Sequence, residues 1–351
     1  TSAPYSTGTN NVAMGYQSLA GFTSAEGNTA IGHQASMDVT TGGYNTSLGY
    51  RAGYNVTSGN NNTAVGAYAL MNSQTISYDT AIGFGALMDN TGNGANVAIG
   101  WNAMNETTTA GNNVAIGYSA LKWGTHVRTI AIGYQAMYDT NAGSTSMGSN
   151  DNIFIGHTAG GGTWADAESK ENVAIGNYAM DGALDGAIRN VAIGHEALTS
   201  ATGADYNQAI GYRALYSANT GGQNSVMGHE AAANITSGGQ NVAIGYHAGY
   251  NNQTGVYNVH IGVQAGYGAA SNSANTNTFV GYKAGYDVST GYNNVAIGGG
   301  ALENVTTGYD NVVVGNYAGD QITTTNFVTL IGRNAGGAIN STDANGTVAI
   351  G

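Results

Sequence analysis

The sequence predicts an all-β fold, a tandem-repeat parallel β-solenoid of about 20 coils with about 17 residues in each coil. Three observations predict it. The pentapeptide Asn-Val-Ala-Ile-Gly, or a close variant, recurs along the whole chain; Gly makes up 57 of 351 residues against a single Pro; and only 8% of residues are charged. A repeat of this length is too short for the two-helix repeats, which need about 33 residues or more, so each coil must be built of strands and turns.

The glycine that ends the pentapeptide is a convenient anchor for aligning the repeats. Thirteen of the 19 intervals between anchors are 17 residues long, and four of the six irregular ones fall within 117–194. We therefore expect one continuous solenoid domain over 1–351, with insertions within 117–194, and we expect it to be part of a longer protein. The anchors lie at 15, 32, 49, 66, 83, 100, 117, 133, 156, 176, 194, 211, 228, 245, 262, 281, 298, 315, 332 and 351.

The residues before each anchor predict a short strand. An aliphatic residue or Met precedes every anchor, and the segment Val/Thr-Ala-Ile-Gly alternates large and small side chains, which is typical of a β-strand. We expect the large side chains to fill the solenoid interior. The small Ala and Gly then face outward, where they let another backbone approach closely.

Two further columns predict turns. Asn stands four residues before the anchor in 16 of 20 repeats, where it suits a turn and, stacked from coil to coil, can form an amide ladder. Thr-Gly or Ser-Gly pairs supply a second turn. The interpretation is a flattened β-roll with two short strands and two turns per coil, which stacks to a rod on the order of 95 Å long at ~4.8 Å per coil.

The predicted core is thin, because each coil contributes only a few apolar side chains, and repeat units bury their apolar surface against neighbours. Ala is found three residues after the anchor in 18 of 19 repeats. This Ala and Gly surface predicts association of the chain with itself, as a parallel homotrimer or by lateral contacts.

Composition excludes several function classes. The formal net charge is −12 and the eight basic residues cannot form a phosphate-binding stripe, so nucleic acid is not an expected partner. No stretch approaches the ~20 apolar residues of a membrane span, so membrane insertion is not expected. Cys is absent, which fits an extracellular location. No nucleophile–base pattern or paired carboxylates stand out, so we predict no enzyme, no catalytic residue, no cofactor and no metal.

The motif Asn-x-Ala-Ile-Gly, followed after a spacer by Ala and a Gly turn, resembles the head repeats of trimeric autotransporter adhesins of the YadA type. The longer form here, Asn-Asn-Val-Ala-Ile-Gly-Tyr-x-Ala-Leu with Thr-Thr-Gly, is similar to repeat regions of bacteriophage tail fibres. The first resemblance implies a left-handed parallel β-roll, a trimer and binding to host surface ligands. The repeat of that family is near fourteen residues, whereas here it is 17.

The position directly after the anchor holds an aromatic ring in 13 of 19 repeats. Two interpretations stay open for this column, packing or lateral stacking of the rings, and stacking on sugars. The histidines in the column never fall on successive coils, so we expect them to be tolerated rings rather than shared metal ligands, which need bonds of about 2.1 Å. They are His33, His157, His195 and His229.

The irregular stretch predicts a receptor contact, because insertions in a solenoid loop out on one face that is often the binding face. A neutral surface insertion is the alternative. The candidate receptor-binding residues are Trp123, Trp164, Asp166, Glu168 and Lys170.

These patterns together favour a structural or adhesive fibre segment, the shaft or head of a phage tail fibre or a surface adhesin. We expect it outside the cell, on a virion or a cell surface, presenting or contributing to the binding of a host receptor such as a carbohydrate. A self-assembling extracellular filament subunit is the alternative, followed by an ice-binding protein, which would need a flat Thr array on a strand face.

Overall fold

A computed structural model of the chain describes residues 6–108, 111–140, 148–165, 167–270, 272–340 and 344–351. The fold is all-β, a parallel β-solenoid of about 19 turns with about 17 residues per coil, as predicted. The chain divides into two compact units, one formed by residues 1–172 with 183–186 and the other by 173–182 with 187–351. None of the described segments forms a helix with the length and apolar character to cross a membrane.

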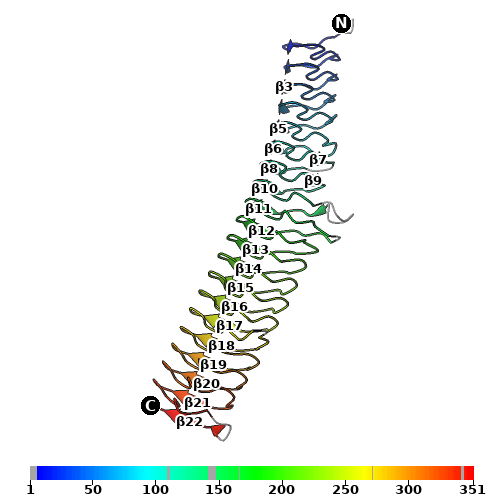
Figure 1. Cartoon of the computed structure of the whole chain (residues 1–351). Coiled ribbons are helices and arrows are strands. Elements are labelled where there is room, and N and C mark those ends of the chain that lie inside the picture. The colour runs from blue at the N-terminus through cyan, green and yellow to red at the C-terminus, as the bar shows by residue number, and fades with distance from the viewer. Residues whose placement is uncertain (1–5, 109–110, 141–147, 166, 271, 341–343) are drawn as a thin grey trace. The chain divides into compact units, whose positions relative to one another are not determined.

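Within each unit, successive coils place their strands side by side in a parallel sheet (Figure 1). The strands pair in register, so that Ala81 lies beside Ala98 and Ala192 beside Ala209. The first unit contains β1 (Val12–Met14), β2 (Thr29–Ile31), β3 (Thr46–Leu48), β4 (Thr63–Val65), β5 (Thr80–Ile82), β6 (Val97–Ile99), β7 (Glu106–Thr107), β8 (Val114–Ile116), β9 (Trp123–Gly124), β10 (Ile130–Ile132) and β11 (Ile153–Ile155).

In the described residues of the second unit, each coil contains one three-residue strand. Its strands are β12 (Val173–Ile175), β13 (Val191–Ile193), β14 (Gln208–Ile210), β15 (Ser225–Met227), β16 (Val242–Ile244), β17 (Val259–Ile261), β18 (Thr278–Val280), β19 (Val295–Ile297), β20 (Val312–Val314), β21 (Thr329–Ile331) and β22 (Val348–Ile350).

The expected second strand of each coil is wrong for nearly all described coils. Among the described residues, only β7 and β9 form a second pair of strands, and both lie in the first unit. The residues two and four after the anchor have left-handed backbone, as Gln34 (φ 56°) and Ser36 (φ 47°) show. Hydrogen bonds between coils nevertheless continue here, for example from the Gln34 N–H to the Tyr16 carbonyl at 2.8 Å. In this segment every second residue has left-handed backbone, so the chain does not form an extended strand. The hydrogen bonds between successive coils are nevertheless kept.

The predicted orientation of the remaining strand is also wrong. The central Ala of each strand faces inward, so that Ala81 and Ala243 are buried, while Ile82 and Ile244 are 38% and 40% exposed. The alternation in side-chain size shows which residues share a face, but it does not say which face is inside. In most such coils the interior has room only for Ala at the strand centre, because a large side chain from the opposite wall of the coil already fills the space.

That opposite wall is the residue four after the anchor, and its size complements the strand centre. Most coils with Ala at the centre carry Leu or Met there, as in the fully buried Leu87 and Met104, whereas Ala30 and Ala243 face Ser36 and Gly249. Coils with an aromatic ring or Leu at the centre carry Gly instead, and the pairs are Phe154 with Gly160, His260 with Gly266, Phe279 with Gly285, and Leu330 with Gly336. A Cβ added to Gly285 would lie 2.4 Å from the Phe279 ring. Most layers of the core are thus filled once, by a large residue on one wall that faces a small residue on the other.

The Asn column forms the predicted amide ladder. In the second unit Asn224 donates its Nδ2–H to Asn207 Oδ1 at 3.0 Å and to the Gly238 carbonyl at 3.1 Å. The same Asn207 oxygen accepts the Asn224 backbone N–H at 3.0 Å. These buried amides satisfy backbone groups that the sharp turn before each strand leaves without a strand partner.

One member of the ladder in the first unit is a carboxyl group. Asp79 Oδ1 accepts the backbone N–H of Asn96 at 2.8 Å, as an Asn would, but its buried Oδ2 has no hydrogen-bond partner. Burial raises the pKa of Asp79 to about 7, against the lowering effect of its hydrogen bonds with Asn96 and Asn90.

The anchor glycines allow close approach of backbone, as predicted, but the approaching backbone belongs to the next coil of the same chain. Gly245 has φ +134°, and a Cβ there would lie 2.5 Å from the Gly262 carbonyl oxygen. Both the backbone angle and the contact exclude other residues at this position.

Candidate functional site

The outer surface of the sheet carries most of the exposed aliphatic side chains in the described part of each unit. It consists of the residues one and three before each anchor, which we call the aliphatic face. Most of these side chains are Ile, Val, Leu, Met or Thr, and they point away from the core. Members that are at least 37% exposed include Leu48, Ile82, Ile175, Ile193, Met227, Ile244, Ile261, Ile297, Val312 and Ile331. A continuous exposed apolar surface of this kind marks an interaction site.

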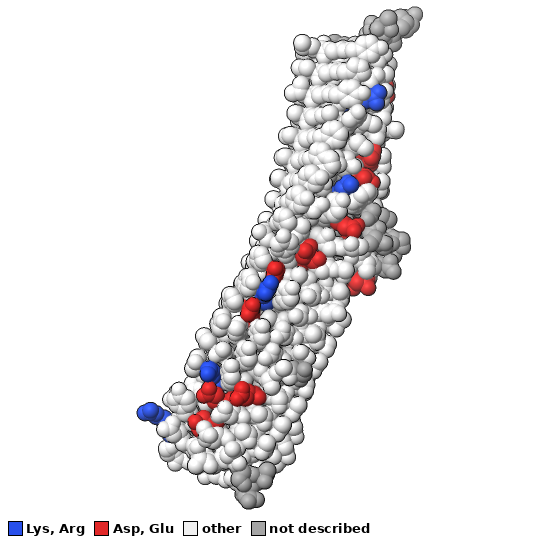
Figure 2. Space-filling model, viewed as in Figure 1, with Lys and Arg blue, Asp and Glu red and all other residues white. Residues whose placement is uncertain are grey.

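Charged side chains are sparse on the visible surface and lie mostly in patches (Figure 2). The aliphatic face includes no charged residue in any described strand. It consists of two columns of outward side chains, one on either side of the buried residue at the strand centre, and both columns repeat along the described strands of each unit. A partner that matches it must offer a regular, uncharged surface with the same spacing between strands.

The aromatic column, one residue after each anchor, forms stacks along the coils. In the first unit Trp101, Tyr118 and Tyr134 stack with ring centroids 4.6 and 5.1 Å apart. In the second unit Tyr212 separates His195 from His229, at 5.6 and 4.8 Å. The rings remain partly exposed, 44% for Trp101 and 37% for Tyr212, so their faces pack on one another and their edges meet solvent.

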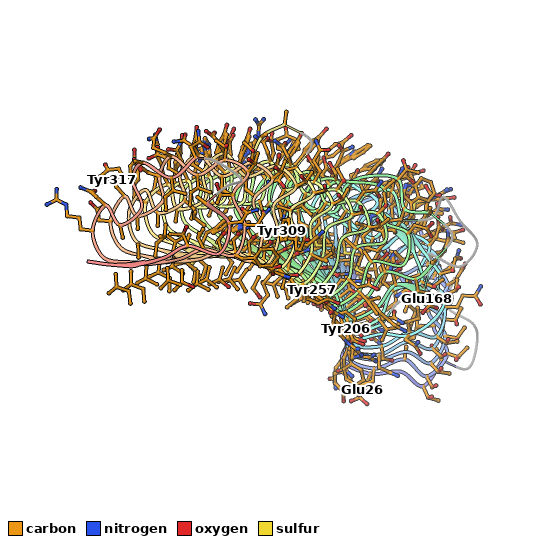
Figure 3. The ribbon with its side chains drawn as sticks, turned by 90° about the horizontal axis from the view of Figure 1, so that it is seen from below. Glu26, Glu168, Tyr206, Tyr257, Tyr309 and Tyr317 are labelled. Carbon is orange, nitrogen blue, oxygen red and sulfur yellow. The ribbon has the colours of Figure 1, made fainter. Side chains whose placement is uncertain are left out.

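A shallow groove of about 410 Å³ lies in the second unit beside the residues that precede the Asn ladder. Gly222 and Gly239 leave it open, because both lie close to the preceding coil and carry no side chain. The side-chain amide of Gln240 donates to Gln223 Oε1 at 2.7 Å within its lining. Tyr206, 44% exposed, lines one end, and the exposed Tyr257 follows Val256 at the other (Figure 3).

The residues predicted from the irregular stretch do not form one surface. Trp164 is fully buried, donates its indole N–H to the Gly160 carbonyl at 2.9 Å, and packs beside Phe154. This corrects its assignment as a receptor contact, because the larger coil around it needs a large side chain to fill its core. Asp166 lies outside the described residues.

The other three predicted residues lie nearer the surface. Trp123 is half-buried in β9, with the Lys122 ammonium 4.3 Å from its ring centroid. Glu168 and Lys170 are exposed and form an ion pair at 3.6 Å. A receptor contact at these three residues stays a prediction.

A cluster that sequence analysis missed brings together His229, Glu230 and His247 in the second unit. One ligand atom from each of the three lies within 4.8 Å of the others, and no other cluster of this kind occurs among the described residues. The prediction considered histidines only in the aromatic column, whereas His247 stands in the next column, two residues after its anchor. The signal available was a Glu and a His 17 residues apart in that column, which stack on successive coils.

In comparisons with known proteins, no protein-family model and no curated protein matches the chain. Its function must therefore be argued from its own surfaces.

Proposed function

We propose that the chain is a structural and adhesive segment of an extracellular surface fibre, of the phage tail fibre or surface adhesin kind, and that it works as a parallel homotrimer. The observation that carries this proposal is the exposed aliphatic face. It is mostly apolar, carries no charge in any described strand, and repeats coil by coil, so an identical chain in the same register offers the matching surface.

A threefold arrangement uses this face fully. Contacts in a closed threefold ring are heterologous, so each chain needs two different patches. The two columns of the aliphatic face provide them, because the column three before the anchor on one chain packs against the column one before the anchor on the next. The aliphatic face thus replaces the Ala and Gly surface that the sequence suggested, since those Ala residues line the interior of the coil and the anchor Gly residues contact the next coil. The resemblance to trimeric adhesin head repeats supports the same number of chains.

Charges on the aliphatic face should separate the chains. We expect light scattering to give three times the chain mass of 35.4 kDa for the natural sequence. The triple substitution Ile193→Lys, Ile244→Lys and Ile297→Lys should give the mass of one chain, because each buried ammonium without a partner costs several kcal/mol at an interface. The matched control places three Lys on exposed turns, as Thr254→Lys, Thr290→Lys and Thr307→Lys, and should stay associated.

The other results would each contradict the proposal in a different way. A natural chain with the mass of one chain would overturn the homotrimer. An open-ended series of larger masses would favour the alternative of a filament subunit. Equal dissociation by the control would show that the aliphatic face is not the contact.

The ice-binding alternative is less well supported. Hydroxyls of the turn threonines already donate to carbonyls of the next coil, as Thr40 does to Thr57 at 3.0 Å and Thr57 to Gln74 at 2.9 Å. On the described strands, outward Thr side chains run through only four successive coils, β2 to β5. The rest of the aliphatic face does not present the regular Thr array that ice binding requires.

Carbohydrate contact is the adhesive part of the proposal, and the groove between Tyr206 and Tyr257 is the surface that favours it. Tyr rings offer an apolar face for a sugar ring, and the Gln223 and Gln240 amides offer hydrogen-bond groups beside it. Glycan-array binding should detect a ligand for the natural chain, and Tyr206→Ala should weaken it about tenfold, the equivalent of 1.4 kcal/mol. Tyr78→Ala, at a tyrosine that occupies the same column in the first unit and is also exposed, is the control. The groove would be rejected as the glycan site if the control lost binding, or if Tyr206→Ala bound the ligand as well as the natural chain does.

A further inference from the structure

The cluster of His229, Glu230 and His247 lies where two successive coils of the second unit stack. His229 and Glu230 are adjacent residues after the anchor Gly228, and His247 stands directly above Glu230, two residues after the next anchor. The backbone N–H of His247 donates to the His229 carbonyl at 3.1 Å, which sets the spacing of the two coils at this point. The side chains of Glu230 and His247 are only 20% and 16% exposed, whereas His229 is exposed.

The polar atoms of the three side chains lie close to one another. His247 Nε2 lies 2.8 Å from Glu230 Oε2, and the ring centroids of His229 and His247 are 6.1 Å apart. Tyr246 stacks on His247 with centroids 3.8 Å apart, and Tyr212 stacks on His229 at 4.8 Å. These rings hold both imidazoles in place, so the donor atoms are largely organised before any ligand arrives.

We propose that these three side chains form a binding site for one divalent transition-metal ion, with Zn²⁺ as the best fit. Two imidazole nitrogens and one carboxylate oxygen are a ligand set that binds zinc with a fourth position open to water. Imidazole ligands select zinc and related transition metals over Mg²⁺ and Ca²⁺, which take oxygen ligands. Entry of the ion replaces the direct contact between Glu230 and His247, and the exposed His229 closes the site from the solvent side.

The chain contains a natural counterpart that lacks the third ligand. His195 and Glu196 occupy the same two columns, and His195 Nδ1 lies 3.8 Å from Glu196 Oε1. The residue stacked above Glu196 is Arg213, which pairs with that carboxylate instead of offering a ligand nitrogen. Arg213 and His247 both have left-handed backbone, with φ 49° and 53°, so the two residues are exchangeable in conformation. One substitution thus separates a metal site from an ion pair.

The test is calorimetric titration of the metal-free chain with ZnCl₂, with bound zinc counted by elemental analysis after dialysis. We expect one Zn²⁺ per chain, a number that does not depend on whether chains associate. His247→Arg should lower the affinity for Zn²⁺ by at least about 100-fold. This loss exceeds the one expected when a residue that only supports a metal ligand is replaced. Arg213→His should raise the number bound to two per chain, because it completes the set His195, Glu196 and residue 213.

Glu230→Gln is a second removal that keeps the shape of the side chain, and it should also abolish tight binding. Circular dichroism checks that each variant is folded. The proposal is overturned if the natural chain binds no zinc, or if it and His247→Arg bind zinc equally. It is overturned equally if Arg213→His, folded, binds no more zinc than the natural chain, because the column geometry would then not define the site. Light scattering of the same samples tests the homotrimer separately.

Discussion

Replacing Phe279 by Ala should lower the free energy of unfolding by about 3–5 kcal/mol, as expected for an aromatic side chain removed from a packed core. Phe279 is fully buried at the centre of β18 and stacks on His260 with ring centroids 5.5 Å apart. Gly285 faces it from the opposite wall of the coil. Gly285→Leu alone should cost about 3 kcal/mol or more, because the added side chain overlaps the Phe279 ring.

The two changes together should nearly cancel. The double variant Phe279→Ala, Gly285→Leu recreates the Ala and Leu pair that other coils use, and Leu87 shows that Leu adopts the required left-handed backbone, with φ 51°. We expect its unfolding free energy within about 1.5 kcal/mol of the natural chain. Urea unfolding followed by circular dichroism measures all four members of the cycle. Additive losses in the double variant would show that the two walls do not share one space.

Replacing Asp79 by Asn should stabilise the chain above neutral pH. The pKa of this buried carboxyl is about 7 in the folded chain, compared with 3.8 when it is exposed. The unfolded chain therefore loses the proton as pH rises through about 4, while the folded chain keeps it until about 7. The resulting destabilisation is absent below pH 4, grows between pH 4 and 7, and reaches about 4 kcal/mol above pH 7.

Asn cannot ionise and restores the regular ladder, so Asp79→Asn removes this loss. In urea unfolding at pH 3.5, the variant and the natural chain should have similar free energies of unfolding. At pH 8 the variant should be more stable by up to about 4 kcal/mol. Glu26→Gln, which removes an exposed carboxylate outside the ladder, is the matched control. A variant that follows the pH profile of the natural chain would mean that Asp79 does not carry the burial cost.

Several features of the fold were determined by the sequence because they act within one coil or between equivalent residues of neighbouring coils. The interval between anchors set the coil length, since parallel in-register pairing stacks like on like. The Asn column formed its ladder because a short amide before each strand reaches the backbone of the coils beside it. The anchor Gly was required because its backbone angle and its contact with the next coil both exclude a Cβ.

Only the tertiary structure decided which side of the strand is inside. Alternation assigns Ala and Ile to opposite faces, but the choice depends on the residue that closes the coil from the far wall, such as Leu87 or Gly285. The same closure buried Trp164, which the sequence placed on the surface. The cluster of His229, Glu230 and His247 likewise needed the coils to be stacked, because its ligands come from two columns and two coils. Short-range sequence patterns determine which residues are neighbours within a coil and between stacked coils. Which side chains share one enclosed volume depends instead on how the coil closes.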